Sequence, residues 1–166
     1  PCFGYSLVEE KRKGEFYPDK ALELGVPKGR LWGKLQNGES VTLDDGRIIS
    51  SSMVMGNPRE GRKFSYVTDS LYFPEISDYV HDSDLLFCEG MFASDLKDSA
   101  HEKKHMTSAE AAMIARDGYC DKLCLQHYSP RYSDRELKVL KDEAREIFPN
   151  TILTRDRMQF DIPLKD

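Results

Sequence analysis

The chain has 166 residues, of which 39% are hydrophobic and 32% charged, a balance typical of one globular domain. No apolar run approaches the roughly 18 residues of a membrane-spanning helix, and no signal-peptide pattern opens the sequence. A net charge of −5 argues against a uniformly basic nucleic-acid-binding protein, although residues 1–35 carry seven basic and only five acidic side chains. The four cysteines form no zinc-knuckle spacing, so we expect reduced, mostly buried thiols in a cytoplasmic protein.

The first third of the chain predicts a core strand followed by an excursion. Residues 1–8 contain aromatic and β-branched types that favour a strand, and they read like the interior of a longer protein, so we expect truncation. Residues 9–50 are polar and glycine-rich, with helical turns expected near Asp19 and a hairpin turning at Asp45-Gly46. A stretch of this length is usually functional or disordered, and we expect it to form an arm.

The remainder, residues 51–166, predicts a layered α/β body that follows a turn-rich linker at 56–62. Thr107 is the expected N-cap of one helix, and Gly118 is expected to end it. Strands alternate with helices, which is the pattern of an α/β fold. The predicted strands are residues 63–68, 84–88, 122–126, 151–153 and 158–162, and the predicted helices are 75–80, 108–117 and 133–147.

Side chains that can bind a metal ion or transfer a proton follow three of these predicted strands directly. Asp69, Glu89 and His127 each come after a short apolar run, and His105 precedes a predicted helix. If the strands are parallel, these side chains share one rim of the sheet, where sites of α/β proteins gather. Together they suit a metal-dependent hydrolase. Each also has an ordinary interpretation: a turn former for Asp69, a solvated carboxylate for Glu89, and surface or packing histidines for the other two.

Four segments resemble motifs of the ribonuclease Z family, which cleaves precursor tRNA at its 3′ end. Residues 66–70 resemble the strand that ends in Gly-Asp-Thr, and residues 86–92 resemble the His-Glu-Ala-Thr loop. Residues 105–112 resemble the His-Ser-Thr loop with its helix, and residues 125–132 resemble the His-x-Ser-x-Arg-Tyr segment. Connecting segments at 25–29, 38–47 and 143–150 match in the same order, so the resemblance spans nearly the whole chain, as the C-terminal half of such an enzyme.

The resemblance implies half of a metallo-β-lactamase-like αββα sandwich that holds two zinc ions. It implies that Asp69 bridges the two zincs, that His127 ligates one of them, and that His105 is a catalytic proton donor oriented by Glu89. Residues expected along the RNA 3′ end are Thr107, Ser129 and Arg131, and those expected in an exosite for the tRNA elbow, within the arm, are Lys28, Gly29 and Arg30.

The chain departs from the family by lacking its His-x-His-x-Asp-His run. Its only histidines are His81, His101, His105 and His127, and none forms that pattern. Two ligands cannot hold two zinc ions at the usual four-coordination. We therefore expect the chain alone to bind zinc weakly and to have little nuclease activity. We also expect a missing N-terminal half or a second copy, in a homodimer, to complete it, because half a sandwich leaves a sheet face and strand edges uncovered.

Two other functions stay open at this point. The chain could belong to a different metallo-β-lactamase-like phosphodiesterase or hydrolase that shares these loops. It could also be an inactive, metal-free piece that serves in dimerisation or RNA binding. Deletion of the arm should abolish tRNA processing but spare the hydrolysis of small phosphodiesters, which distinguishes the first alternative. Metal analysis of the purified protein distinguishes the second, which binds no metal.

Overall fold

The computed structural model describes residues 2–165, which divide into two compact units. The sheet unit contains the chain up to Glu9 together with Arg62–Leu164, and the small unit contains Glu10–Gly61. Each unit has its own cluster of buried apolar side chains. Among the described residues, no helix is both long enough and apolar enough to cross a bilayer.

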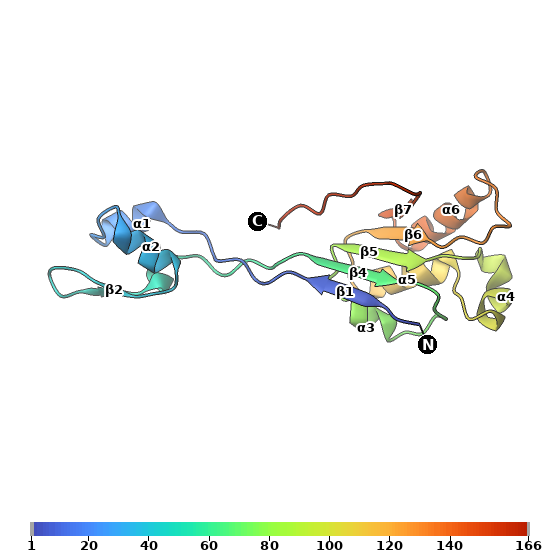
Figure 1. The fold of residues 1–166 in the computed structure, drawn as a ribbon, viewed down its shortest axis with the longest axis horizontal. Coiled ribbons are helices and arrows are strands. Elements are labelled where there is room, and N and C mark those ends of the chain that lie inside the picture. Colours follow the sequence, from blue (N-terminus) through green and yellow to red (C-terminus); the bar gives the residue numbers. More distant parts are fainter. Residues whose placement is uncertain (1, 166) are drawn as a thin grey trace. The chain divides into compact units, whose positions relative to one another are not determined.

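A five-stranded sheet in the order β1-β4-β5-β6-β7 forms the centre of the sheet unit (Figure 1). The first strand is antiparallel to its neighbour, and the other three pairs are parallel. The carboxyl ends of the parallel strands therefore meet at one edge of the sheet. The strands are β1 (Tyr5–Val8), β4 (Lys63–Val67), β5 (Leu85–Glu89), β6 (Leu123–Gln126) and β7 (Thr151–Leu153).

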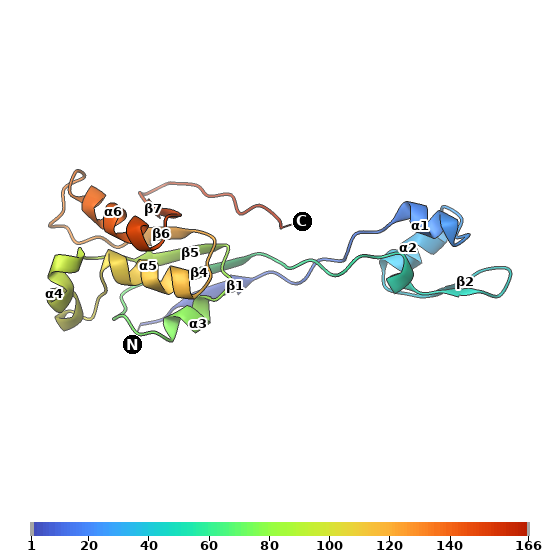
Figure 2. The ribbon, with the colours of Figure 1, turned by 180° about the vertical axis from the view of Figure 1, so that it is seen from behind.

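Helices cover one face of this sheet, as the view from behind shows (Figure 2). The core lies between them and the strands, where Leu86 and Leu125 pack with Met106 and Ile114, all fully buried. The helices of the unit are α3 (Ile76–Val80), α4 (Lys97–Glu102), α5 (Ser108–Asp117) and α6 (Leu137–Ile147), with a short 3-10 turn at Ser94–Leu96. The predicted α/β class is confirmed, and helices on one face of a sheet are what half of an αββα sandwich has.

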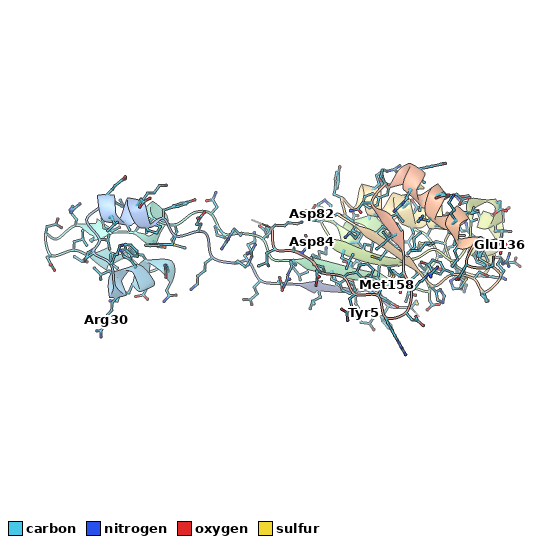
Figure 3. All side chains as sticks on the ribbon, turned by 90° about the horizontal axis from the view of Figure 1, so that it is seen from above. Tyr5, Arg30, Asp82, Asp84, Glu136 and Met158 are labelled. Carbon is cyan, nitrogen blue, oxygen red and sulfur yellow. The ribbon has the colours of Figure 1, made fainter. Side chains whose placement is uncertain are left out.

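The opposite face of the sheet is apolar and has no helical layer among the described residues. Phe64 and Phe87 pack edge to face there at 5.6 Å between ring centroids, and Phe160 adds a third ring 5.5 Å from Phe87. On the neighbouring edge strand, Tyr5 and Leu7 are 64% and 69% exposed. The side chain of Tyr5 is labelled in Figure 3. Large apolar side chains this exposed mark a surface that normally has a partner.

The small unit is built around Val26, Leu35, Ile49 and Val54, which are nearly or fully buried. Its hairpin is confirmed: Gly46 has a φ of 86°, and Asp45 accepts hydrogen bonds from Arg47 across the turn. The elements are α1 (Pro18–Glu23), α2 (Arg30–Gln36), β2 (Val41–Thr42), β3 (Ile48–Ile49) and a 3-10 turn at Ser51–Met53. The second helix was not predicted, because Gly29 and Gly33 indicated a loop.

The predicted strand at residues 158–162 is wrong. The segment is irregular in the structure, and no strand of the described residues pairs with it. Its alternating Met158, Phe160 and Ile162 satisfy the period of a strand, but a strand also needs a hydrogen-bonded neighbour. The predicted helix at 133–147 is regular from Leu137 to Ile147. It is preceded by a hydrogen-bonded turn in which Glu136 accepts bonds from the backbone and hydroxyl of Ser133, and the N–H of Leu137 donates to the carbonyl of Ser133.

Candidate metal centre

Three of the residues singled out from the sequence converge at the carboxyl edge of the sheet. Asp69 lies just beyond β4, His127 follows β6 directly, and His105 lies on the loop that leads into α5. One potential ligand atom from each lies within 4.8 Å of the other two. Asp69 and His127 have positive φ angles of 49° and 56°, a conformation that non-glycine residues adopt rarely and that is frequent at functional sites.

The distances within this cluster suit ligands that face a common point. His127 Nε2 lies 3.3 Å from Asp69 Oδ1, and the rings of His105 and His127 are 5.3 Å apart at their centroids. Asp69 is half-exposed and His105 is largely buried, so the cluster opens to solvent on the side of the carboxylate.

Glu89 is fully buried behind the two histidines. Its Oε2 lies 2.9 Å from His105 Nδ1 and 3.9 Å from His127 Nδ1, and its Oε1 accepts the backbone N–H of Ser70. Burial raises the pKa of Glu89 to about 7, while the Ser70 N–H and the nearby His127 oppose that rise. A carboxylate in this position fixes the ring of His105 and leaves Nε2 as its outward-facing nitrogen.

A second buried carboxylate, Glu110, anchors both ends of the His105 loop. Its Oε2 accepts the backbone N–H of Thr107 at 3.0 Å, and its Oε1 contacts Lys97 at 3.2 Å and His101 at 2.7 Å, both on α4. Although burial works in the opposite direction, the bonds from Thr107, His101 and Lys97 lower the pKa of Glu110. The contact between Thr107 and Glu110 could be found from the sequence, since the two residues have the spacing of a capping box.

The three predicted RNA-binding residues follow the two histidines of the cluster along the chain, but they differ in solvent exposure and in the hydrogen bonds they already make. Thr107 is buried, and its hydroxyl is occupied by the backbone and side chain of Glu110. Ser129 is also buried and accepts a hydrogen bond from Arg131 Nε at 3.2 Å. Arg131 itself is exposed, with its guanidinium 4.9 Å from the ring centroid of Phe92. Their roles toward RNA stay predictions.

The three predicted exosite residues belong to the small unit. Lys28, Gly29 and Arg30 form the end of the loop before α2 and the first residue of that helix. Gly29 has a φ of 140°, which the absence of a side chain permits. Lys28 Nζ lies 6.0 Å from the ring centroid of Trp32, and Arg30 projects into solvent (Figure 3). Their role toward tRNA also stays a prediction.

The whole sequence is similar to those of known proteins. The chain is 52% identical over all of its 166 residues to a ribonuclease Z of Treponema denticola, of which it covers 54%. The chain is a relative of ribonuclease Z. It is also 47% identical over its full length to the ribonuclease Z of Treponema pallidum, and 42% identical over 163 residues to that of Gemmatimonas aurantiaca. The chain thus spans about half the length of the curated ribonuclease Z relatives that it matches.

No family model matches the chain. Among solved structures, a metallo-β-lactamase fold protein of Bacillus subtilis is 26% identical, with a TM-score of 0.49 over 55% of this chain and 36% of the other. The human short-form tRNase Z is 23% identical, with a TM-score of 0.49 over 70% of this chain and 37% of the other.

The donor set of the cluster fits the kind of metal that the ribonuclease Z resemblance implies. Two imidazoles and one carboxylate are ligands that zinc accepts, and a further carboxylate behind the imidazoles is the usual support for metal-bound histidines. The described residues offer three such ligand atoms at this point, which is fewer than two four-coordinate zinc ions need.

Proposed function

We propose that this chain supplies one side of the active site of a zinc-dependent endonuclease that removes the 3′ trailer of precursor tRNA. The observation that supports this most strongly is the convergence of Asp69, His105 and His127 at the carboxyl edge of the sheet. The similarity to ribonuclease Z over the whole chain favours RNA as the substrate rather than another phosphodiester.

In this proposal Asp69 and His127 hold the metal. When bound, zinc supplies a water of lowered pKa and positive charge for the developing oxyanion. A carboxylate beyond one strand and an imidazole beyond another, held 3.3 Å apart, present oxygen and nitrogen to the same point without rearrangement of the backbone. Further ligands come from outside the described residues, so the chain alone binds zinc weakly and has little nuclease activity.

His105 acts as the proton donor to the oxygen that leaves the phosphorus. Its Nδ1 is occupied by Glu89, so Nε2 is the nitrogen available to substrate. The buried Glu89 holds the ring orientation and stabilises the imidazolium before the proton is transferred. Cleavage on the 3′ side of the discriminator nucleotide then releases a tRNA with a 3′ hydroxyl.

The proposal includes a partner for the uncovered sheet face. Tyr5 and Leu7 extend the apolar face that Phe64 and Phe87 form, and none of the helices covers them. We propose that this surface is covered either by a segment like the part of the ribonuclease Z relatives that this chain does not span, or by a second copy in a homodimer. We place the assembled enzyme in the cytoplasm, where its tRNA substrate is.

The small unit provides the test that separates tRNA processing from other phosphodiester hydrolysis. We would use a chimera in which this chain replaces the matching 54% of the Treponema denticola ribonuclease Z. Replacing residues 10–61, which form most of the small unit, with a short glycine-serine linker should abolish cleavage of precursor tRNA. Hydrolysis of bis(p-nitrophenyl) phosphate should be retained, because the cluster lies entirely in the sheet unit.

Because the deletion could disturb folding, substitutions of exposed side chains in the small unit provide a second test with its own control. Lys28→Gln with Arg30→Gln removes two exposed charges, and Lys11→Gln removes an exposed lysine that is paired with Glu60. The double variant should raise the KM for precursor tRNA by about tenfold, and the control should leave it unchanged. Retention of tRNA cleavage after the deletion would show that the small unit is not the exosite. Hydrolysis of bis(p-nitrophenyl) phosphate without any cleavage of precursor tRNA by the undeleted chimera would instead indicate a different metallo-β-lactamase-like phosphodiesterase.

A further inference from the structure

Two cations from different loops lie against one buried aromatic ring. Lys103 Nζ is 5.7 Å, and the guanidinium carbon of Arg131 is 4.9 Å, from the ring centroid of Phe92. Phe92 is only 1% exposed, whereas Lys103 and Arg131 are both exposed. Within residues 2–165, neither cation has a carboxylate partner. An aromatic face attracts cations, but two like charges on one ring repel each other unless an anion joins them.

The main chain around Phe92 joins the two loops that carry the histidines of the candidate metal centre. The backbone carbonyl of Phe92 accepts the N–H of Ser108 at 2.9 Å, at the start of the helix after His105. On the other side, Met91 O accepts the N–H of Ser129 at 3.1 Å, and Tyr132 Oη accepts the N–H of Ala93 at 2.9 Å. The loop around Phe92 is therefore tied by hydrogen bonds to both histidine loops.

The positions of the two cations along the chain follow from this arrangement. Lys103 precedes His105 by two residues, and Arg131 follows His127 by four. Each cation therefore lies on the same loop as one histidine of the cluster and within four residues of it along the chain.

We propose that Lys103 and Arg131 together bind one backbone phosphate of the RNA, next to the phosphate that is cleaved. This inference rests on the proposed function. The fork of Arg131 can donate two parallel hydrogen bonds to a phosphate, and Lys103 adds a point charge from the opposite loop. The ring of Phe92 is covered, so it cannot stack on a base, and the contact is to the backbone without base specificity. Because the overall charge is −5, the attraction of a phosphate to this surface must come from local groups of cations such as this pair.

The test measures the affinity of the full chain for labelled precursor tRNA at several KCl concentrations. Lys103→Gln and Arg131→Gln should each weaken binding, and each should reduce the slope of log affinity against log salt by about one. Lys104→Gln is the matched control, because Lys104 is the neighbouring exposed lysine and lies on no aromatic ring among the described residues. It should change neither quantity.

Sharing of one phosphate makes a further prediction for the double variant. Lys103→Gln with Arg131→Gln should weaken binding by clearly less than the product of the two single effects, because each single change already disrupts the same contact. Phe92→Leu keeps an apolar side chain but removes the ring, and should produce a loss similar to that of Lys103→Gln. A Lys103→Gln variant that behaves like Lys104→Gln would overturn the proposal.

The chimera separates failure of this inference from failure of the proposed function. If the chimera cleaves precursor tRNA and Lys103→Gln does not raise its KM, only the phosphate contact is wrong. If the chain does not bind precursor tRNA and the chimera does not cleave it, both are wrong. Lys104→Gln should leave both the cleavage of precursor tRNA and the hydrolysis of bis(p-nitrophenyl) phosphate by the chimera unchanged.

Discussion

Replacing Asp69 with asparagine in the chimera should slow cleavage of precursor tRNA by at least about a thousandfold. The amide keeps the size of the side chain but removes the negative charge that faces His127 Nε2 at 3.3 Å. Metal-assisted hydrolysis draws several kcal/mol of charge stabilisation from the ion, and each ~1.4 kcal/mol corresponds to a factor of about ten in rate. Single-turnover cleavage of a 3′-extended tRNA, with zinc content measured on the same samples, checks this result.

Asp82 provides a control that matches Asp69 in backbone conformation. It is exposed and has a φ of 57°, close to the 49° of Asp69, but it follows α3 and lies outside the cluster. Asp82→Asn should leave the rate and the zinc content unchanged. An Asp69→Asn variant that retained both would contradict the assignment of Asp69 as a metal ligand.

Replacing His105 with asparagine should lower the rate of tRNA cleavage by about 10²- to 10⁴-fold while zinc content is retained. This range is what positioned acid–base groups contribute, and the Glu89 contact at 2.9 Å fixes the imidazole for that role. Both quantities must be measured on the variant, because His105 lies close enough to Asp69 and His127 to act as a ligand instead. A proton donor should lose rate and keep zinc, whereas a ligand should lose both.

His101 is the matched control for this substitution. It lies on α4 and contacts the buried carboxylate Glu110 at 2.7 Å, as His105 contacts Glu89, but it is not part of the cluster. His101→Asn should have little effect on the rate, because Lys97 and the backbone N–H of Thr107 still hold Glu110. Loss of zinc together with activity in His105→Asn would make His105 a ligand, and the role of proton donor would then fall to another group.

The sequence predicted the α/β body and the residues of the cluster because both depend on local patterns. Short apolar runs followed by Asp69 and His127 indicate strands that end in functional side chains, and parallel order then brings those ends to one edge. The N-cap of α5 at Thr107 could also be predicted from the sequence, since a capping box requires only a suitable residue, here Glu110, three positions later.

The features that the sequence could not reveal depend on contacts between distant segments. Lys103 and Arg131 meet on Phe92 only because two loops pack against a third, and no local spacing encodes that meeting. The segment at 158–162 has the alternation of a strand, but pairing depends on whether a neighbouring strand is present. Glu89 was predicted to orient His105, but its complete burial emerged only when the sheet and helices were assembled.

The central claim is that Asp69 and His127 jointly hold a divalent metal ion. The most direct measurement is the anomalous difference map at the zinc absorption edge from crystals of the chimera grown with zinc. We expect a peak about 2.0–2.2 Å from Asp69 Oδ1 and His127 Nε2. Zinc peaks that contact neither side chain, in crystals of an enzyme that cleaves precursor tRNA, would contradict it.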